Sequence, residues 1–150
     1  MYKGQFPGLI LSASILLASL LLPAAAQTTD YDAVYQTALE AFKSGKYIEA
    51  ISGFQGLLNR SRVHPLSDNA QYWLGECHYA KKNYLKAAIE FEKVFTFPTS
   101  NKHDDAQLKL GLCYLRLDDK EGARREFTHL LSRYPNSEFA DLAKKMLNEL

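Results

Sequence analysis

One short pattern of residues recurs three times in the chain at a nearly constant spacing. An alanine follows three residues after the first position and a phenylalanine four residues later, as in Tyr47-x-x-Ala50-x-x-x-Phe54, Tyr84-x-x-Ala87-x-x-x-Phe91 and Lys120-x-x-Ala123-x-x-x-Phe127. The copies start 37 and then 36 residues apart. A fixed period in the mid-thirties indicates an array of helical hairpins. Such arrays are stacked scaffolds, so the sequence predicts an all-α fold whose main role is binding.

Apolar residues follow the 3.6-residue period of a helix from Tyr31 almost to the C-terminus. We expect hairpins over about residues 31–64, 65–101 and 102–135, and a closing helix over residues 137–150. The expected hairpin turns lie at residues 44–46, 81–83 and 118–120, and Gly45 is placed to adopt the left-handed conformation that ends a helix. Together, residues 27–150 form one predicted domain.

Small residues recur at two sets of matched positions, which predicts close helix crossings. Gly75 and Gly111 each follow a leucine, and Ala38 occupies the same place in the first repeat. Ala50, Ala87 and Ala123 form the second set. Glycine within a helix costs about 1 kcal/mol relative to alanine, so its presence at matched positions implies a steric reason. We expect Phe54, Phe91 and Phe127 to fill the space between repeats.

The first 26 residues are typical of a secretory signal peptide that is removed on export. A lysine at position 3 precedes an apolar run from Leu9 to Leu22, and Ala24, Ala25 and Ala26 supply a cleavage site before Gln27. The alternative is a transmembrane anchor, which needs about 20 apolar residues. No cysteine lies near the expected cut, which argues against an acylated lipoprotein. We therefore predict a periplasmic protein whose only membrane contact precedes cleavage.

Charge and cysteine content limit the possible partners further. Residues 27–150 hold 17 basic and 17 acidic side chains, so there is no positive excess for nucleic acid. Cys77 and Cys113 occupy equivalent positions in neighbouring repeats, where helix axes lie about 8–10 Å apart. A disulfide needs Cα atoms within about 7 Å, so two buried free thiols are expected, with a disulfide as the alternative.

No pattern of catalytic or metal-binding residues occurs in the chain. The four histidines, His64, His78, His103 and His129, never lie three or four residues apart, and neither cysteine belongs to a C-x-x-C pair. Phosphate-loop, G-x-S-x-G and H-E-x-x-H motifs are missing from the sequence. We predict neither cofactor, metal nor enzymatic activity.

The spacing of Leu74-Gly75, Tyr84, Ala87, Phe91 and Pro98 resembles that of the tetratricopeptide repeat (TPR) family. Leu110-Gly111, Tyr114, Ala123, Phe127 and Pro135 follow the same pattern. The resemblance implies a right-handed solenoid of three helix-turn-helix repeats with a C-terminal capping helix. The first repeat departs from the pattern at Thr37-Ala38, and the third has Lys120 where an aromatic is usual.

A narrower resemblance covers most of residues 31–150. The segment Asn69–Glu76 is similar to a stretch in the C-terminal TPR domain of the periplasmic coordinator of Tol–Pal-linked cell division. That family usually carries an N-terminal trimerising coiled coil, which is missing between the signal and the repeats. Outer-membrane assembly lipoproteins built of similar repeats are the second relative.

In TPR proteins the first helix of each hairpin lines a concave groove. The resemblance therefore implies a partner-binding groove made by Tyr35, Leu39, Phe42, Lys43, Asn69, Tyr72, Glu76, Tyr79, Asp105, Leu108, Leu112, Leu115 and Arg116. The mixture of apolar anchors and polar groups suits an extended or helical peptide. The alternative is that these side chains pack against the next helix, and for Leu108 and Leu112 the closing helix is the candidate cover.

We expect an exported, noncatalytic scaffold that binds a peptide or protein of the cell envelope, with a possible role in division. Two alternatives stay open: an outer-membrane assembly component, and a module that self-associates through its apolar groove. A third, an envelope hydrolase, would need a pocket with convergent polar groups.

Overall fold

The computed structural model describes residues 24–150, with side chains from residue 30 onward. Most of the predicted signal peptide therefore lies outside the described residues. The predicted cleavage point between Ala26 and Gln27 falls in the first turn of the first helix, which begins at Ala24.

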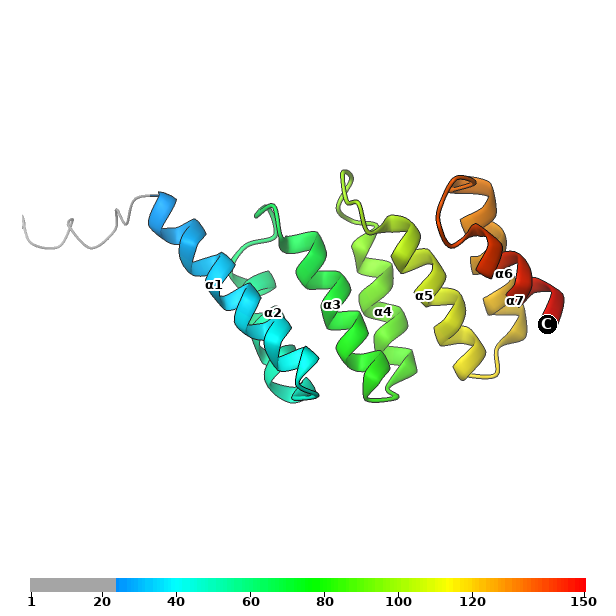
Figure 1. The fold of residues 1–150 in the computed structure, drawn as a ribbon, viewed down its shortest axis with the longest axis horizontal. Helices are drawn as coiled ribbons and strands as arrows, with labels where there is room; N and C mark the ends of the chain where they lie inside the picture. Colours follow the sequence, from blue (N-terminus) through cyan, green and yellow to red (C-terminus); the bar gives the residue numbers. More distant parts are fainter. Residues whose placement is uncertain (1–23) are drawn as a thin grey trace, which may run out of the picture.

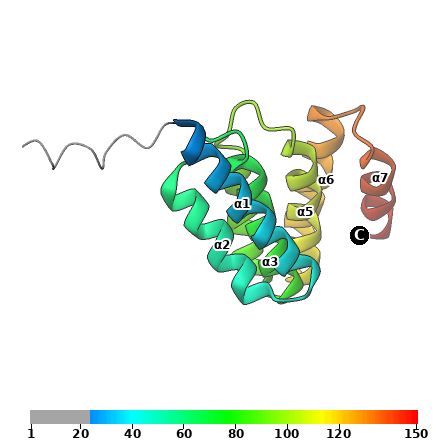
Figure 2. The same ribbon diagram turned by 60° about the vertical axis from the view of Figure 1, so that its left-hand side comes forward.

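The described residues form seven α-helices and no strand. Their bounds are α1 (Ala24–Lys43), α2 (Tyr47–Arg60), α3 (Ser67–Ala80), α4 (Tyr84–Val94), α5 (His103–Arg116), α6 (Lys120–Arg133) and α7 (Ala140–Glu149). Each helix packs against the next one along the chain. Figure 1 shows α1, α3 and α5 in one layer and α2, α4 and α6 behind them, and Figure 2 shows α7 at the far end of the array. The expected all-α solenoid is confirmed.

The three hairpin turns share one backbone conformation. Gly45 has φ +74°, and the equivalent residues Lys82 and Asp118 have φ +59° and +61°. In the first turn the Gly45 amide donates to the Phe42 carbonyl and the Lys46 amide to the Ala41 carbonyl, both at 2.9 Å. This pair of bonds defines a Schellman helix end, which requires one left-handed residue. The left-handed conformation predicted at Gly45 is therefore confirmed, and two side-chain-bearing residues share it.

Three hydrophobic clusters follow one another along the array, and each uses a hairpin together with the first helix of the next. Phe54, Phe91 and Phe127 lie at the centre of the successive clusters and are completely buried. In the third cluster α7 takes the place of the missing next hairpin, and Ala143 packs with Leu108 and Phe127. The expected closing helix thus begins at Ala140, three residues later than its predicted start.

The glycines predicted at the helix crossings have the expected steric role. A Cβ added to Gly75 would lie 2.7 Å from the Phe91 ring, and one added to Gly111 would meet Phe127 in the same way. Ala50, Ala87 and Ala123 are all fully buried. In the first repeat the glycine at the crossing lies on the second helix, α2, and faces Ala38 of α1. A Cβ on Gly53 would lie 2.7 Å from the Cβ of Ala38.

Both cysteines are free and buried, as expected. Cys77 belongs to the first cluster and Cys113 to the second. Removal from water raises the pKa of each thiol to about 12. The thiols are therefore protonated at neutral pH and act as small apolar core groups.

Candidate protein-binding surface

The face formed by α1, α3 and α5, called here the front face, carries all the residues predicted to line a groove. The repeat places them in matched rows that cross the three helices. One row contains Tyr35, Tyr72 and Leu108, a second contains Leu39, Glu76 and Leu112, and a third contains Phe42, Tyr79 and Leu115. The structure therefore places all these positions on the three helices of one layer, at matched levels (Figure 1).

The first of these rows is buried, which corrects the prediction for three residues. Tyr35, Tyr72 and Leu108 are only 6%, 7% and 4% exposed. The rings of Tyr35 and Tyr72 pack against Phe54 and Phe91 at centroid distances of 5.7 and 5.6 Å, whereas Leu108 belongs to the cluster closed by α7. These positions point between neighbouring helices, so their side chains stabilise the fold and do not line an open groove.

The other predicted residues keep solvent-accessible surface. Leu39, Phe42, Asn69, Glu76, Tyr79, Asp105, Leu112 and Leu115 are half-buried, and Lys43 and Arg116 are exposed. Leu112 and Leu115 also pack against the third cluster, which includes residues of α7. Contact of these ten residues with a partner stays a prediction.

The front-face aromatic residues Phe42, Trp73 and Tyr79, called here the aromatic floor, take part in two separate ring contacts. Phe42 of α1 packs against Trp73 of α3 with ring centroids 5.0 Å apart, and Tyr79 packs edge-on against Tyr84 at 5.2 Å. Trp73 is half-buried and was not among the predicted groove residues. Its contact with Phe42 of α1 shows that it reaches the front face, which sequence spacing did not reveal.

A charged pair crosses the front face between α3 and α5. The Lys109 ammonium donates to Glu76 Oε2 at 2.8 Å, and the same ammonium lies 5.3 Å from the centre of the Tyr79 ring. The other carboxylate oxygen, Glu76 Oε1, is buried and has no hydrogen-bond partner in the described part of the chain. Sequence reasoning identified Glu76 but missed Lys109, because nothing in the spacing showed that the two helices meet at this level.

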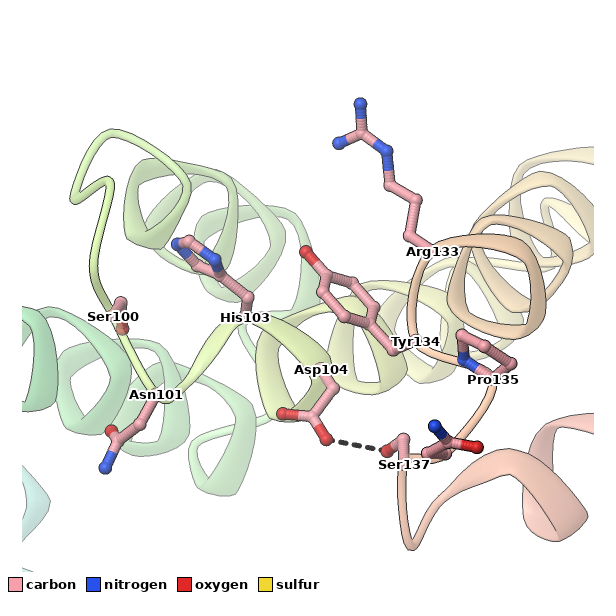
Figure 3. Close-up of a pocket in the computed structure, with 9 residues that line it drawn as sticks. Ser100, Asn101, His103, Asp104, Arg133, Tyr134, Pro135 and Ser137 are labelled. Atoms are coloured by element: carbon pink, nitrogen blue, oxygen red, sulfur yellow. Dashed lines mark hydrogen bonds between the residues drawn. The ribbon is translucent and has the colours of Figure 1, made fainter.

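A second site, which the sequence did not predict, lies at the edge where the inter-repeat loops meet. Figure 3 shows this cleft of about 390 Å³ between the α4–α5 and α6–α7 loops, and Arg133, Tyr134, His103 and Asp104 are among its lining residues. Asp104 Oδ2 accepts a 2.7 Å hydrogen bond from Ser137 Oγ, which ties the α6–α7 loop to the first turn of α5. His103 Nε2 lies 2.8 Å from the Phe97 carbonyl oxygen. His103, Asp104 and Ser137 are thus engaged in holding the loops against α5.

A similar cleft lies one repeat earlier, between the α2–α3 and α4–α5 loops. It measures about 420 Å³ and includes Arg62, His64, Asp68 and Phe97 in its lining. The Arg62 guanidinium stacks over the Phe97 ring at 4.9 Å and donates to Thr96 at 3.1 Å. The matching clefts are a consequence of the repeat, and their polar side chains chiefly hold neighbouring loops in place.

Within residues 24–150 there is no group of three or more histidine, cysteine, aspartate or glutamate side chains arranged to hold a metal ion. No helix among these residues has the length and apolar character needed to cross a bilayer.

Comparison with known proteins identifies a matching family and a similar fold. Residues 27–150 match the YfiO family, described as an outer membrane lipoprotein. The outer membrane protein assembly factor BamD of Xylella fastidiosa is 28% identical over 152 residues, with the whole chain aligned. The chain spans 44% of the length of that relative. These findings do not show the narrower resemblance to the Tol–Pal coordinator.

Among solved structures, the type III secretion translocator chaperone SycD of Yersinia enterocolitica is similar, with a TM-score of 0.65 and 22% identity. The match covers 79% of this chain and 89% of the chaperone. At this level of identity the likeness concerns the fold, and it agrees with the TPR-like array described above.

Proposed function

The chain belongs to the YfiO outer membrane lipoprotein family, and from this premise we propose that it is a noncatalytic scaffold for outer-membrane protein assembly. It holds protein segments on its front face. The similarity to an outer membrane protein assembly factor supports this role more directly than a role in division. The envelope location expected from the sequence agrees with the family.

The observation that carries the proposal is the composition of the front face. Half-buried aromatic side chains at Phe42, Trp73 and Tyr79 form its floor, with the exposed cations Lys43 and Arg116 at the edge. Aromatic anchors surrounded by polar groups are the usual composition of a protein-binding surface. The front face therefore provides anchors for a partner without any reactive group.

A role in Tol–Pal-linked division is the second candidate. It rests on the resemblance of the segment Asn69–Glu76 to the division coordinator. The two roles predict different partners at the same surface: an outer-membrane protein in the first case and a division protein in the second. Self-association through the front face is the third candidate. Light scattering would reveal it as an average molecular mass that rises with protein concentration.

Attachment to the membrane is a separate part of the proposal. The family is described as a lipoprotein, whereas the sequence predicts cleavage before Gln27 with no cysteine nearby. Cys77 and Cys113 are buried within α3 and α5, so neither is available for acylation in the folded chain. We propose that the exported chain is held at the outer membrane through protein contacts. Intact mass spectrometry should give the mass of residues 27–150, and the added mass of acyl chains would contradict this part.

Photocrosslinking in living cells tests the binding face. A benzophenone side chain placed at Tyr79 or Leu115 should capture an outer-membrane assembly partner. The control position is Leu85 of α4, which is 64% exposed and lies in the other layer. Capture of the same partner from Leu85 but not from the front face would contradict the proposal, and capture of division proteins would favour the second candidate.

A further inference from the structure

Glu76, which pairs with Lys109, interrupts an otherwise apolar row on the front face. One repeat earlier, the equivalent positions hold Leu39 and Trp73, which both pack against the first cluster. In the third repeat the position of Glu76 is taken by Leu112. The fold therefore accepts apolar residues here, so the charged pair is not required for the packing of the array. Departures from a local structural rule concentrate at functional positions.

The bonding state of the pair leaves one acceptor and at least one donor unused. Glu76 Oε2 receives the Lys109 ammonium at 2.8 Å, but Glu76 Oε1 is enclosed without a hydrogen-bond partner among the described residues. A buried acceptor without a donor destabilises the folded chain. An ammonium carries three N–H donors. Among the side chains described from residue 30 onward, Lys109 bonds only to Glu76, apart from its contact with the Tyr79 ring.

The charge balance restricts what can complete these bonds. Glu76 and Lys109 neutralise each other, and their side chains are only 15% and 22% exposed. A further charged group placed beside them would lose hydration without a counterion. A neutral N–H donor next to a neutral carbonyl acceptor fits both unused positions, and a peptide unit provides this combination. Glu76 Oε2 has a second lone pair, so it can accept a peptide N–H while it keeps its bond to Lys109.

We propose that Glu76 and Lys109 recognise the backbone of an extended polypeptide segment bound across α3 and α5. The Glu76 carboxylate accepts from a peptide N–H, and the Lys109 ammonium donates to a peptide carbonyl. A helical partner is excluded from this contact because its backbone groups are bonded within the helix. The neighbouring aromatic floor holds the side chains of the segment, whereas the pair selects its backbone conformation. This inference rests on the proposed function, because it assigns the kind of partner bound at the same face.

A double variant can remove the charged pair by using residues that already occupy the equivalent positions in other repeats of this chain. Glu76→Leu introduces the residue found at the equivalent positions 39 and 112, and Lys109→Gln introduces the residue found at position 36. Replacing a partly buried ion pair by residues that suit the site is usually tolerated. Circular dichroism and thermal unfolding should therefore show a folded double variant with a midpoint no lower than that of the natural chain.

The probe is a set of decapeptides selected from a random phage-displayed library on the natural chain. Only peptides whose binding is weakened by Tyr79→Ala are kept, because that change marks the front face. We expect N-methylation of one internal peptide nitrogen to weaken binding to the natural chain by about tenfold and binding to the double variant by less than about twofold. The unmethylated peptide should bind the double variant about tenfold more weakly.

The outcomes separate the two levels of the proposal. Front-face peptides that tolerate N-methylation at every nitrogen, that become helical on binding, or that bind the double variant equally would overturn backbone recognition and leave the binding face intact. Failure to select any peptide sensitive to Tyr79→Ala would overturn both the proposed function and this inference.

Discussion

The buried carboxamide of Gln71 donates to Glu90 twice, to the backbone carbonyl at 3.1 Å and to the carboxylate at 2.7 Å. One repeat later Gln107 donates to the carboxylate of Glu126 at 2.6 Å. Both glutamines are almost fully buried, at 1% and 4% exposed. The same polar contact thus joins the two helices of the second and third hairpins.

The two copies of this contact predict different responses to the same substitution. Glu126→Ala leaves the Gln107 amide without its described partner and should destabilise the chain by about 1–3 kcal/mol. Glu90→Ala should cost about 1 kcal/mol or less, because the Gln71 amide keeps its bond to the residue-90 carbonyl. Urea unfolding of both variants measures the difference, and a larger loss for Glu90→Ala would contradict the assignment.

The left-handed residues in the hairpin turns predict two opposite effects. Lys82→Gly should stabilise the chain by about 0.5–1 kcal/mol, because an L-residue in this conformation is strained by about 1–2 kcal/mol. Gly45→Ala is the matched control and should destabilise by about 1 kcal/mol for the same reason. Thermal unfolding checks both, and a loss of stability in Lys82→Gly would show that the lysine side chain has a role that its turn does not reveal.

The contact between Gly75 and Phe91 predicts a compensating pair of substitutions. Phe91→Ala should cost about 3–5 kcal/mol, since the ring is fully buried. Gly75→Ala should cost about 1–3 kcal/mol, because the new methyl group meets the ring. The double variant Gly75→Ala/Phe91→Ala should lose less stability than the sum of the two single losses, because the new methyl group no longer meets a ring. Strict additivity would mean that the two residues do not press on each other.

Ala87, on the other helix of the same hairpin, tests the second crossing position. Its side chain is completely buried, so Ala87→Leu should destabilise by about 1–3 kcal/mol through overpacking. The exposed neighbour Leu85 provides the control, because Leu85→Ala removes a side chain that is 64% exposed and should change stability by about 0.5 kcal/mol or less. An Ala87→Leu variant as stable as the natural chain would show a looser crossing.

The half-buried His78 predicts a pH dependence of stability. Burial lowers its pKa below the ordinary value of 6.5, although the nearby Glu90 partly opposes the change. The unfolded chain therefore binds the proton first, so the stability associated with neutral His78 is present above about pH 6.5 and is lost as the pH falls below it. His78→Gln should flatten the decline of unfolding free energy between about pH 6.5 and 5. An unchanged slope would contradict the assignment.

The fold could be predicted from sequence because its determinants are local and repeated. Gly75 and Phe91 recur as Gly111 and Phe127, and each pair describes one steric contact that sequence spacing reveals. The Gln–Glu contact was open to the same reasoning, since Gln71 and Glu90 each recur 36 residues later. It was not predicted, because neither residue belongs to the apolar and small-residue pattern that defines the repeat.

The front face was harder to predict because exposure depends on how neighbouring repeats lean on one another. Tyr72 and Tyr79 lie seven residues apart on one side of α3, yet Tyr72 is buried and Tyr79 keeps accessible surface. The pairing of Glu76 with Lys109 depends on how far α5 is shifted along its axis relative to α3. No sequence pattern within one repeat predicts this shift. The loop clefts depend on connector geometry, which the helical period does not determine.

Hydrogen exchange on the chain, with and without a urea-unfolded outer-membrane barrel protein, tests the central claim most directly. If the front face binds extended segments during assembly, amides of α3 and α5 should gain protection on mixing, whereas those of the opposite helices α2 and α4 should not change. Protection confined to α2 and α4 would contradict the account. So would unchanged exchange at every amide in the presence of a large excess of the unfolded barrel protein.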